Sequence, residues 1–513
     1  MTLQLSPVYR GEQIRAAEKP LLDAGKGEQL MRRAAHGLAY RVLQILEQTG
    51  GVYGARVTGL IGPGNNGGDG LWALAFLRRR GVDAHAVLLR EKAHPAGLEA
   101  FRRAGGRTAE DIPAGTSVLI DAILGTGFKG AFTRPEVPGL QQAVSAAVVV
   151  ACDLPSGVDA DTGAAAADVI PADHTVTFGG LKQGLLAGAG GRLSGTVHTV
   201  DIGLGPQLPK TPVHAAEPAQ PGTGPAPGAE PENPAAPAML PAVRGPQAAD
   251  HKYSRGTLGI LAGSEQFPGA ALLTASAACA TGCGMVSLYA PAEVNRLVLQ
   301  RRPEVVPGTA PATAPEAGKA PAAVVIGPGL GQDPQRMAEA EAALEHALQE
   351  AVPCVLDASG LQLVRTQLRR RGGLNKNVLI TPHAGEARRL AQDLRDPVLT
   401  KQLTPGAGED PVEAARRLAG ALDCSVLLKG TTTIIASPQG EVILHRAQTP
   451  GLATAGTGDV LSGILGALAA TQPKDWSAVA VHAVDLHRRA AVRIDPHGRG
   501  RFGASALIAA LGS

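Results

Sequence analysis

The chain has 513 residues, of which 44% are hydrophobic and 18% are charged, so it is long enough for two or three domains with apolar cores. A formal net charge of +3 and an aromatic content of 3% exclude the basic, aromatic-rich surface typical of nucleic-acid binding. The sequence shows neither a membrane-spanning apolar stretch nor a signal peptide. Its five cysteines are scattered, which favours buried thiols in a reducing, cytoplasmic compartment.

The first part of the chain alternates short apolar runs with helical stretches. The runs at 55–62, 83–90, 116–123 and 146–153 predict strands. The segment 71–81 has apolar residues at helical spacing and ends at a glycine. Nearly continuous apolar strands that alternate with helices indicate a parallel sheet covered on both faces.

A change of composition follows. Residues 205–247 are dominated by Pro, Ala and Gly and lack an apolar period, which predicts a largely disordered linker that is dispensable for chemistry. The alternative is a long surface loop within one domain. We therefore expect domains at 1–204 and 248–513, joined by a linker at 205–247.

The last part repeats the same α/β pattern. The predicted strands are 256–263, 322–329, 353–358, 377–382 and 425–430. A β-hairpin is expected next, with its turn at Pro438, Gln439 and Gly440.

Polar residues follow the predicted strands of the first domain. GPGNNGGDG at 62–70 is a glycine-rich turn that opens a helix, a pattern that favours phosphate or dinucleotide binding. Asp69 within it would repel a phosphate unless a cation lies nearby. Asp121 and Asp153 also end strands, at the sheet edge where open α/β sheets bind ligands. The alternatives are a tight turn without a ligand and aspartates that only cap helices.

Three loops of the second domain suit phosphoryl transfer. AGTGD at 455–459 opens an apolar helix, where the amides of Gly456, Thr457 and Gly458 would hold the moving phosphoryl group. Asp459 is placed to take a proton from an attacking hydroxyl. LLKGTTT at 427–433 offers groups for a nucleotide phosphate, and TPHAGE at 381–386 presents His383 at a strand-to-helix turn. The alternatives are a capping aspartate and a structural histidine.

The motifs GPGNNGGDG, DAILGTG, DLPSGVD and TFGGLKQGLL, in this order over residues 10–203, resemble the epimerase domain of the bifunctional NAD(P)H-hydrate repair enzymes. The resemblance implies a Rossmann-like, three-layer domain with a parallel sheet. It implies a potassium ion bound by Asn66, Asp121 and Ser156, and Asp153 is our candidate for proton transfer. Substrate contacts are implied for Asn65, Asn66, Gly67, Gly68, Asp69, Gly125, Thr126, Gly127, Phe128, Lys129, Gly130, Ala131 and Asp153. Arg32 departs from the acidic residue expected in the family's first helix.

Over residues 248–510, HKYSRG, GSEQFPGA, IGPGLG, TPHAGE and AGTGD resemble the ribokinase-like NAD(P)H-hydrate dehydratases. The resemblance implies ADP or ATP as co-substrate, with Mg²⁺. Nucleotide contacts are implied for Lys429, Gly430, Thr431, Thr432, Thr433 and Gly458. Contacts to the hydrated dinucleotide are implied for Ala270, Gly329, His383 and Asp459.

The whole chain is thus expected to epimerise the R and S forms of NADHX and NADPHX, the hydrated dinucleotides, and to dehydrate the S form. We expect a homo-oligomer that binds neither nucleic acid nor membrane. Two alternatives stay open at this point. The second domain could be a ribokinase-like small-molecule kinase, and the first could be a non-catalytic, nucleotide-sensing module.

Overall fold

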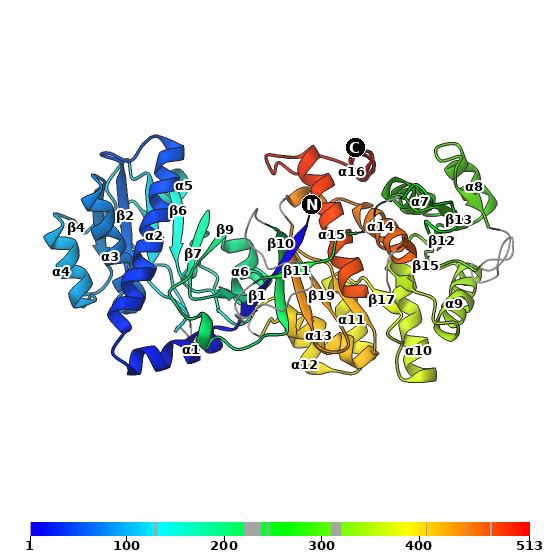
Figure 1. Cartoon of the computed structure of the whole chain (residues 1–513), viewed down its shortest axis with the longest axis horizontal. Helices are drawn as coiled ribbons and strands as arrows, with labels where there is room; N and C mark the ends of the chain where they lie inside the picture. The colour runs from blue at the N-terminus through cyan, green and yellow to red at the C-terminus, as the bar shows by residue number, and fades with distance from the viewer. Residues whose placement is uncertain are drawn as a thin grey trace.

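The computed structural model describes residues 2–127, 131–219, 237–243, 245, 247–308, 320–406, 408–447, 449–471 and 475–512. Two lobes lie side by side along the long axis (Figure 1). Each lobe is built on a sheet with helices on both faces, so the expected α/β class is confirmed.

The N-terminal lobe contains a seven-stranded, wholly parallel sheet in the order β4-β3-β2-β5-β6-β7-β9 among the described residues. Its strands are β2 (Arg56–Ile61), β3 (Asp83–Leu88), β4 (Arg107–Ala109), β5 (Val118–Ala122), β6 (Val148–Cys152), β7 (His174–Phe178) and β9 (Thr196–Val200). Its helices are α1 (Gly11–Asp23), α2 (Gly27–Thr49), α3 (Asn65–Arg79), α4 (Pro95–Arg103), α5 (Leu140–Ala146) and α6 (Gly188–Leu193).

The parallel order of this sheet fits its residues. The strands β2, β5 and β6 are buried along almost their whole length, because helices cover both faces. Helices α1 to α4 share one apolar cluster with one face of the sheet, and α5 shares another cluster with the opposite face. The expected three-layer arrangement is therefore present.

The C-terminal lobe is formed around a larger sheet of thirteen strands, counted over the described residues. The strands from the second half of the chain are β12 (Thr257–Leu261), β13 (Met285–Tyr289), β14 (Val306–Pro307), β15 (Ala323–Ile326), β16 (Cys354–Leu356), β17 (Val378–Ile380), β18 (Ser425–Leu428), β19 (Thr432–Ala436) and β20 (Val442–Arg446). The helices are α7 (Pro268–Thr281), α8 (Ala292–Leu299), α9 (Pro334–Gln349), α10 (Leu363–Arg371), α11 (Ala384–Asp393), α12 (Pro397–Gln402), α13 (Pro411–Leu422), α14 (Thr457–Thr471), α15 (Trp476–Ile494) and α16 (Ala504–Leu511).

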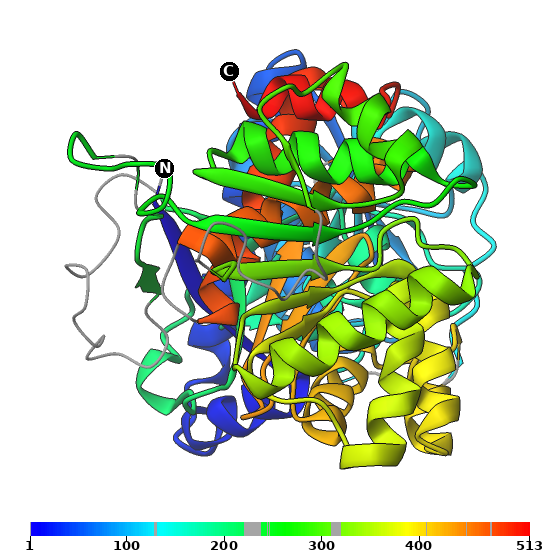
Figure 2. The same ribbon diagram turned by 90° about the vertical axis from the view of Figure 1, so that its right-hand side faces the viewer.

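Two helical layers cover this sheet. Helices α7, α8 and α14 to α16 share an apolar cluster with one face, and α9 to α13 share a cluster with the other. Figure 2 shows the strands between these two layers. Strands β12 to β18 pair in parallel, whereas β18, β19 and β20 pair antiparallel, so the predicted hairpin is confirmed.

Four strands differ from the expected domain boundaries. Strand β1 (Leu3–Tyr9) lies in the sheet of the C-terminal lobe, beside β10 (Val213–Pro218) and β11 (Ala238–Leu240). Strand β8 (Leu181–Lys182) pairs in parallel with β1. Strand β10 continues that sheet by pairing in parallel with β20. The described parts of 205–247 thus include two short strands, because their backbone groups find partners distant in the chain. The remainder of this predicted linker, 220–236 with Arg244 and Pro246, lies outside the described residues.

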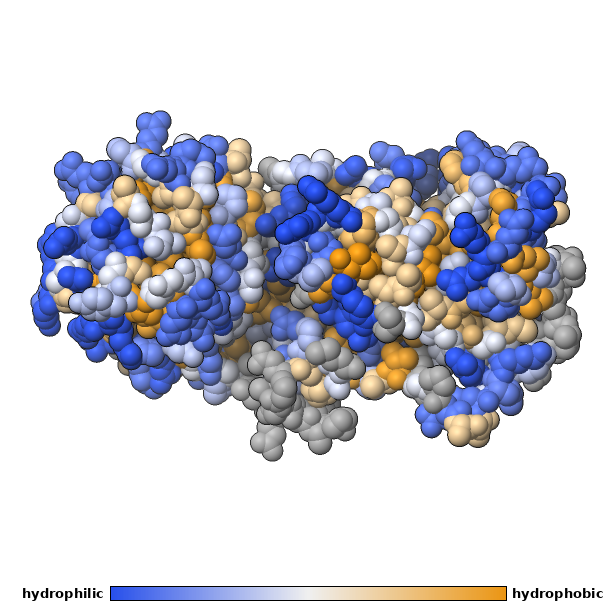
Figure 3. All heavy atoms as spheres, turned by 90° about the horizontal axis from the view of Figure 1, so that it is seen from above, coloured by the Kyte–Doolittle hydropathy of each residue, from blue (hydrophilic) through white to orange (hydrophobic). Residues whose placement is uncertain are grey.

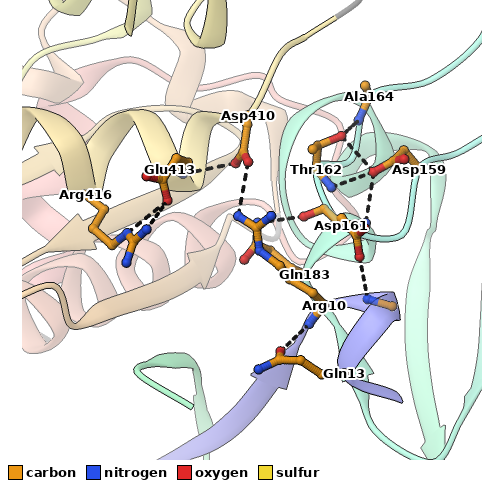
Figure 4. A network of polar contacts seen from close by, with 11 residues as sticks. Arg10, Gln13, Asp159, Asp161, Thr162, Ala164, Gln183, Asp410, Glu413 and Arg416 are labelled. Carbon is orange, nitrogen blue, oxygen red and sulfur yellow. Dashed lines mark hydrogen bonds and ion pairs between the residues drawn. The ribbon is translucent and has the colours of Figure 1, made fainter. Parts of the chain in front are cut away.

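The two lobes share an apolar core. One buried cluster contains apolar residues of β18 to β20 together with Leu181, Leu186 and Ala187 of the N-terminal lobe. Polar contacts surround this junction (Figure 4): Arg10, which follows β1, donates to Asp410 at 3.4 Å, and Gly11 N donates to Asp161 Oδ1 at 2.6 Å. From above, the surface is continuous between the lobes, with hydrophilic and hydrophobic side chains intermixed (Figure 3).

The structure also bears on the expectations for the cysteines and for membrane-spanning segments. Cys152, Cys354 and Cys424 are buried, Cys279 and Cys283 are partly exposed, and all five thiols are free. Among the helices described, none has the length and apolar content required to cross a bilayer.

Candidate functional sites

A cavity of about 720 Å³ lies in the N-terminal lobe at the carboxyl ends of β2, β5 and β6. The start of α3 and the loop after β5 form its walls, together with α1, because Arg15 donates to Thr126 O at 2.7 Å. Seven of the predicted substrate-contact residues line it. These are Asn65, Asn66, Asp69, Gly125, Thr126, Gly127 and Asp153.

Asp153 is a buried carboxylate at the centre of a hydrogen-bond network. Its Oδ1 accepts from Lys182 Nζ at 2.7 Å and from the Thr177 hydroxyl at 3.1 Å, and its Oδ2 accepts from the Thr126 amide at 3.1 Å and from the Thr126 hydroxyl. Burial alone would raise its pKa, but the Lys182 ammonium and these hydrogen bonds lower the pKa of Asp153 below its ordinary value. Asp153 is therefore held ionised.

A second carboxyl group in the cavity has the opposite tendency. Burial, followed by the negative charges of Asp153 and Glu18, raises the pKa of Asp69 well above its ordinary value. Glu18 on α1 also lines the cavity, and burial raises its pKa. A carboxyl group with a lowered pKa and two with raised pKa values thus face one cavity, a combination that suits the removal and return of a proton.

Asp121 and Ser156 form a buried pair beside this cavity. The Ser156 hydroxyl donates to Asp121 Oδ1 at 2.6 Å and its amide donates to Oδ2 at 2.8 Å. Burial raises the pKa of Asp121, and no cationic side chain within the described ranges pairs with it. The Nδ2 of Asn66 is buried without a hydrogen-bond partner. Buried oxygen ligands, a carboxylate without a cationic partner and a side-chain amide that can present its oxygen fit a monovalent cation.

The other epimerase-motif residues lie elsewhere. Helix α3 begins at Asn65, so Gly67 and Gly68 belong to its first turns and pack against Gly62 and His94 rather than lining the cavity. Backbone approaches this close leave no room for a Cβ. Ala131 is exposed outside the cavity lining. The predicted contacts Phe128, Lys129 and Gly130 lie outside the described residues.

In the C-terminal lobe, the first turn of α14 lies beside a partly buried ion pair. Lys429 Nζ donates to Asp357 Oδ1 at 2.8 Å, and Ser462 donates to Asp357 Oδ2 at 2.7 Å. Asp459 is close enough for both charges to act on it. Burial and the charge of Asp357 raise the pKa of Asp459 to about 6, while Lys429 opposes the shift. A carboxyl group with this pKa can take up a proton near neutral pH.

A cavity of about 660 Å³ opens next to this ion pair. Four of its lining residues, Lys429, Gly430, Thr431 and Thr433, come from the LLKGTTT segment, and Gly458 comes from the start of α14. On its other side, burial lowers the pKa of His487 to about 4, and the ring donates from Nε2 to Thr457 O at 3.0 Å. The amide of Thr457, one of three expected to hold a phosphoryl group, donates to Thr454 O at 3.3 Å.

The prediction for Thr432 differs from the structure. Successive side chains of a strand point to opposite faces, so Thr431 and Thr433 line the cavity while Thr432 faces away. Its hydroxyl donates to Leu186 O of the N-terminal lobe. Thr432 is therefore a contact between the lobes rather than a residue of the cavity lining.

The remaining dehydratase residues lie on neighbouring loops. The Ala270 Cβ is only 2.5 Å from the position a Cβ would take at Gly329, where φ is +66°, so these two residues touch. His383 caps α11, because its ring accepts a hydrogen bond from Gly385 N at 3.0 Å. The backbone of His383 forms an isolated parallel β-bridge with that of Lys429. The side chain of His383 stays 54% exposed, with its Nε2 3.6 Å from Glu386 Oε1, so its ring is accessible from solvent.

Three residues of these sites were missed by the sequence analysis: Lys182, Glu18 and Asp357. Asp357 ends a predicted strand, as Asp121 and Asp153 do, and this signal could have identified it. Lys182 is a cation in the buried run of TFGGLKQGLL, where only an anionic partner would stabilise it. Glu18 shows no such signal on its helix.

The comparisons with known proteins match both lobes. Residues 27–184 match the family model described as YjeF-related protein N-terminus, and residues 258–504 match the one described as NAD(P)H-hydrate dehydratase. The chain is 42% identical to the bifunctional NAD(P)H-hydrate repair enzyme Nnr of Mycobacterium tuberculosis, over 90% of this chain and 89% of the relative.

The chain belongs to the bifunctional NAD(P)H-hydrate repair enzymes. The Corynebacterium glutamicum relative with the same name is 32% identical over 90% of this chain and 87% of its own length. The ADP/ATP-dependent NAD(P)H-hydrate dehydratase of Bacillus subtilis, co-crystallised with ATP/Mg²⁺, matches 52% of this chain and 91% of its own, with 29% identity and a TM-score of 0.44. The chain is thus a repair enzyme with an epimerase region and a dehydratase region, as the sequence motifs predicted.

Proposed function

We propose that the N-terminal cavity epimerises the R and S forms of NADHX and NADPHX, with Asp153 as the base and Asp69 as the acid. The observation that supports this is that the two carboxyl groups line one cavity with their pKa values shifted in opposite directions. Lys182 and Thr126 lower the pKa of Asp153, while burial and neighbouring negative charge raise the pKa of Asp69. Inversion at one carbon can proceed by removal of a proton from one face and its return to the other, which this pair can supply.

A potassium ion at Asn66, Asp121 and Ser156 belongs to the same proposal. The buried, uncompensated Asp121 carboxylate and the unsatisfied Asn66 amide support it. When bound, the ion would supply positive charge that favours an anionic substrate beside Asp69 and Asp153. Replacement of potassium by a bulky organic cation should slow epimerisation, and an unchanged rate would remove the cation from the mechanism.

We further propose that the C-terminal cavity binds ADP or ATP and that Asp459 activates the hydroxyl of the S form. The supporting observation is the carboxyl group with a pKa of about 6 at the start of α14, beside Lys429. The dipole of α14 would stabilise charge on the transferring phosphoryl group. Lys429, which is paired with Asp357, would bind the phosphates of the nucleotide. Mg²⁺ would be bound through the same phosphates. Phosphate then leaves from the ring and the adjacent ring carbon loses a proton, which forms the double bond and restores the dihydropyridine.

Incubation of the protein with mixed R and S NADHX and either ADP or ATP tests both proposals. We expect the absorbance of NADH to recover from both forms, with free phosphate released in equal amount. Recovery from the S form alone would argue against the epimerase assignment. A stable phosphoester in place of free phosphate would identify a small-molecule kinase. Light scattering on the same sample tests the expected homo-oligomer.

A further inference from the structure

Helix α6 of the epimerase region is fastened to the hairpin β19–β20 of the dehydratase region. Arg446 on β20 donates to Gly191 O at 2.7 Å and to Gly195 O at 2.8 Å. Thr432 on β19 donates to Leu186 O, just before α6, and Leu186 is itself buried in the shared core. Two hydrogen-bonded side chains and an apolar contact therefore fix α6 relative to the hairpin.

This placement makes α6 one wall of the dehydratase cavity. Gly191 and Arg192 line the same 660 Å³ space as Lys429, Gly430 and Gly458, although more than two hundred residues separate them in the chain. Arg192 is in the last turn of α6, and its side chain is exposed. The cavity that we assign to the nucleotide is thus shaped by both regions.

The charges around this cavity suit a polyanion. Its described lining contains the cations Arg192, Lys429, Arg446 and Arg488 and no carboxylate. Three of these cations already have strong partners. Lys429 is paired with Asp357, Arg446 with two carbonyl groups, and Arg488 with Asp485 at 2.7 Å.

Arg192 differs from the other three. Within the described ranges its guanidinium donates one long hydrogen bond, of 3.4 Å, to Gly188 O of its own helix. Most of its five N–H donors are consequently free for a ligand, and a guanidinium matches the geometry of phosphate oxygens.

We propose that Arg192 binds a phosphate oxygen of the nucleotide in the dehydratase cavity, so that the epimerase region completes the nucleotide site. The proposal rests on the assignment of this cavity to ADP or ATP under the proposed function. It also implies a reciprocal effect: a nucleotide that contacts Arg192 stabilises the position of α6 by as much as α6 favours the nucleotide.

Binding of ATP, ADP and AMP to the full-length protein and to Arg192→Gln, measured by calorimetry, tests this. One charge-assisted contact at an exposed position should be worth about a three- to tenfold change in affinity. We expect the loss to be largest for ATP and smallest for AMP, Arg192→Lys to bind between the two proteins, and epimerisation to be unchanged. Arg107→Gln, an exposed arginine on β4 at the opposite end of the same lobe, is the matched control.

Hydrogen exchange gives a readout that is independent of affinity. ATP should slow amide exchange in residues 186–196 of the unsubstituted protein and have much less effect on them in Arg192→Gln. Equal affinity of the two proteins for all three nucleotides overturns the proposal, because each nucleotide carries a phosphate.

A variant at Lys429, in the cavity that we assign to the nucleotide, distinguishes a failure of that assignment from a failure of the role of Arg192. Lys429→Met should weaken ATP binding strongly, and Thr433→Val serves instead where Lys429→Met does not fold. If neither these changes nor Arg192→Gln alters ATP affinity, the nucleotide assignment itself is wrong. If only Arg192→Gln has no effect, the nucleotide assignment stands and the role of Arg192 fails.

Discussion

Asp459 shows how one side chain can restrict chemistry to one region. A hydroxyl is a weak nucleophile until its proton is removed, and Asp459→Asn keeps the shape but not the base. We expect dehydration to slow by about 10²–10⁴-fold, with nucleotide binding and epimerisation preserved. Since the pKa of Asp459 is raised to about 6, the dehydration rate of the native enzyme should fall as the pH drops through about 6.

Initial rates of both reactions from pH 5 to 8 check this prediction. Near-normal dehydration by Asp459→Asn would show that another group is the base. An equal fall in epimerisation would contradict the division of labour between the two regions.

Lys182 gives a second prediction at the scale of a residue. Lys182→Met leaves Asp153 buried without its cation, so the pKa of Asp153 should rise and the acid limb of the epimerisation profile should move to higher pH. Loss of one partner of a buried ion pair destabilises a protein by about 3–5 kcal/mol. Because the native pairing lowers the Asp153 pKa, the stability it provides is present above the ordinary pKa and is lost as pH falls through the lowered one.

Chemical denaturation and pH–rate profiles measure these two effects. Lys19→Met, which removes an exposed ion pair with Asp23, is the matched control and should change neither. An unshifted profile in Lys182→Met would mean that Lys182 does not set the ionisation of Asp153.

Residues at strand ends were predictable from the sequence, whereas their partners were not. Asp121 and Asp153 follow apolar runs, and parallel strands bring their carboxyl ends to one edge, so their proximity follows from local patterns. Lys182 meets Asp153 only through the fold between them. The direction of Thr432 depends on where β19 begins, which the motif LLKGTTT does not specify.

At the scale of elements, the strands at the edge of the large sheet were hidden from the sequence. Strands β10 and β11 lie in a Pro/Ala/Gly-rich segment that lacks an apolar period, and β1 precedes the first recognisable motif. Each pairs with a strand far away in the chain. Local periodicity indicates whether a strand is buried but not which distant strand it pairs with. The expected domain boundaries at 204 and 248 therefore did not take this pairing into account.

This pairing changes what a cut in the segment 220–236 should do. Both fragments should keep their activities but stay together on a gel-filtration column, since β10 pairs with β20 and β1 pairs with β11 across the cut. A fragment of residues 237–513 made alone lacks β1 and β10. Its melting temperature should be about 5–10 °C below that of the cut protein, because a loss of a few kcal/mol of stability lowers the melting temperature by about 2–4 °C per kcal/mol.

Thermal unfolding of the cut protein and of the isolated fragment measures the difference. Two fragments that separate freely, each with full stability, would show that the paired strands contribute little and that the segment is a simple linker.

At the scale of the whole molecule, the shared core predicts that both lobes unfold together. The sequence has two tryptophans, Trp72 in the epimerase region and Trp476 in the dehydratase region, and both are buried. Fluorescence of Trp476→Phe reports the first lobe, and that of Trp72→Phe reports the second. Since Leu181, Leu186 and Ala187 are buried in the cluster of the other lobe, we expect each variant to show the same unfolding midpoint by fluorescence as by circular dichroism.

Urea titrations of the two variants make this comparison, with circular dichroism correcting for any stability lost by the substitution itself. A fluorescence midpoint that precedes the dichroism midpoint in one variant would show that its lobe unfolds independently.

The position of β1 also constrains the order in which the protein can form on the ribosome. Residues 3–9 form β1 and emerge first. Strand β1 pairs with β10, which pairs with β20, and β20 ends at Arg446. At about 5–20 residues per second, β20 is completed at least about twenty seconds after β1 and at least about ten seconds after β10. During synthesis the first lobe therefore carries an unfinished sheet edge, which the last third of the chain must arrive to close.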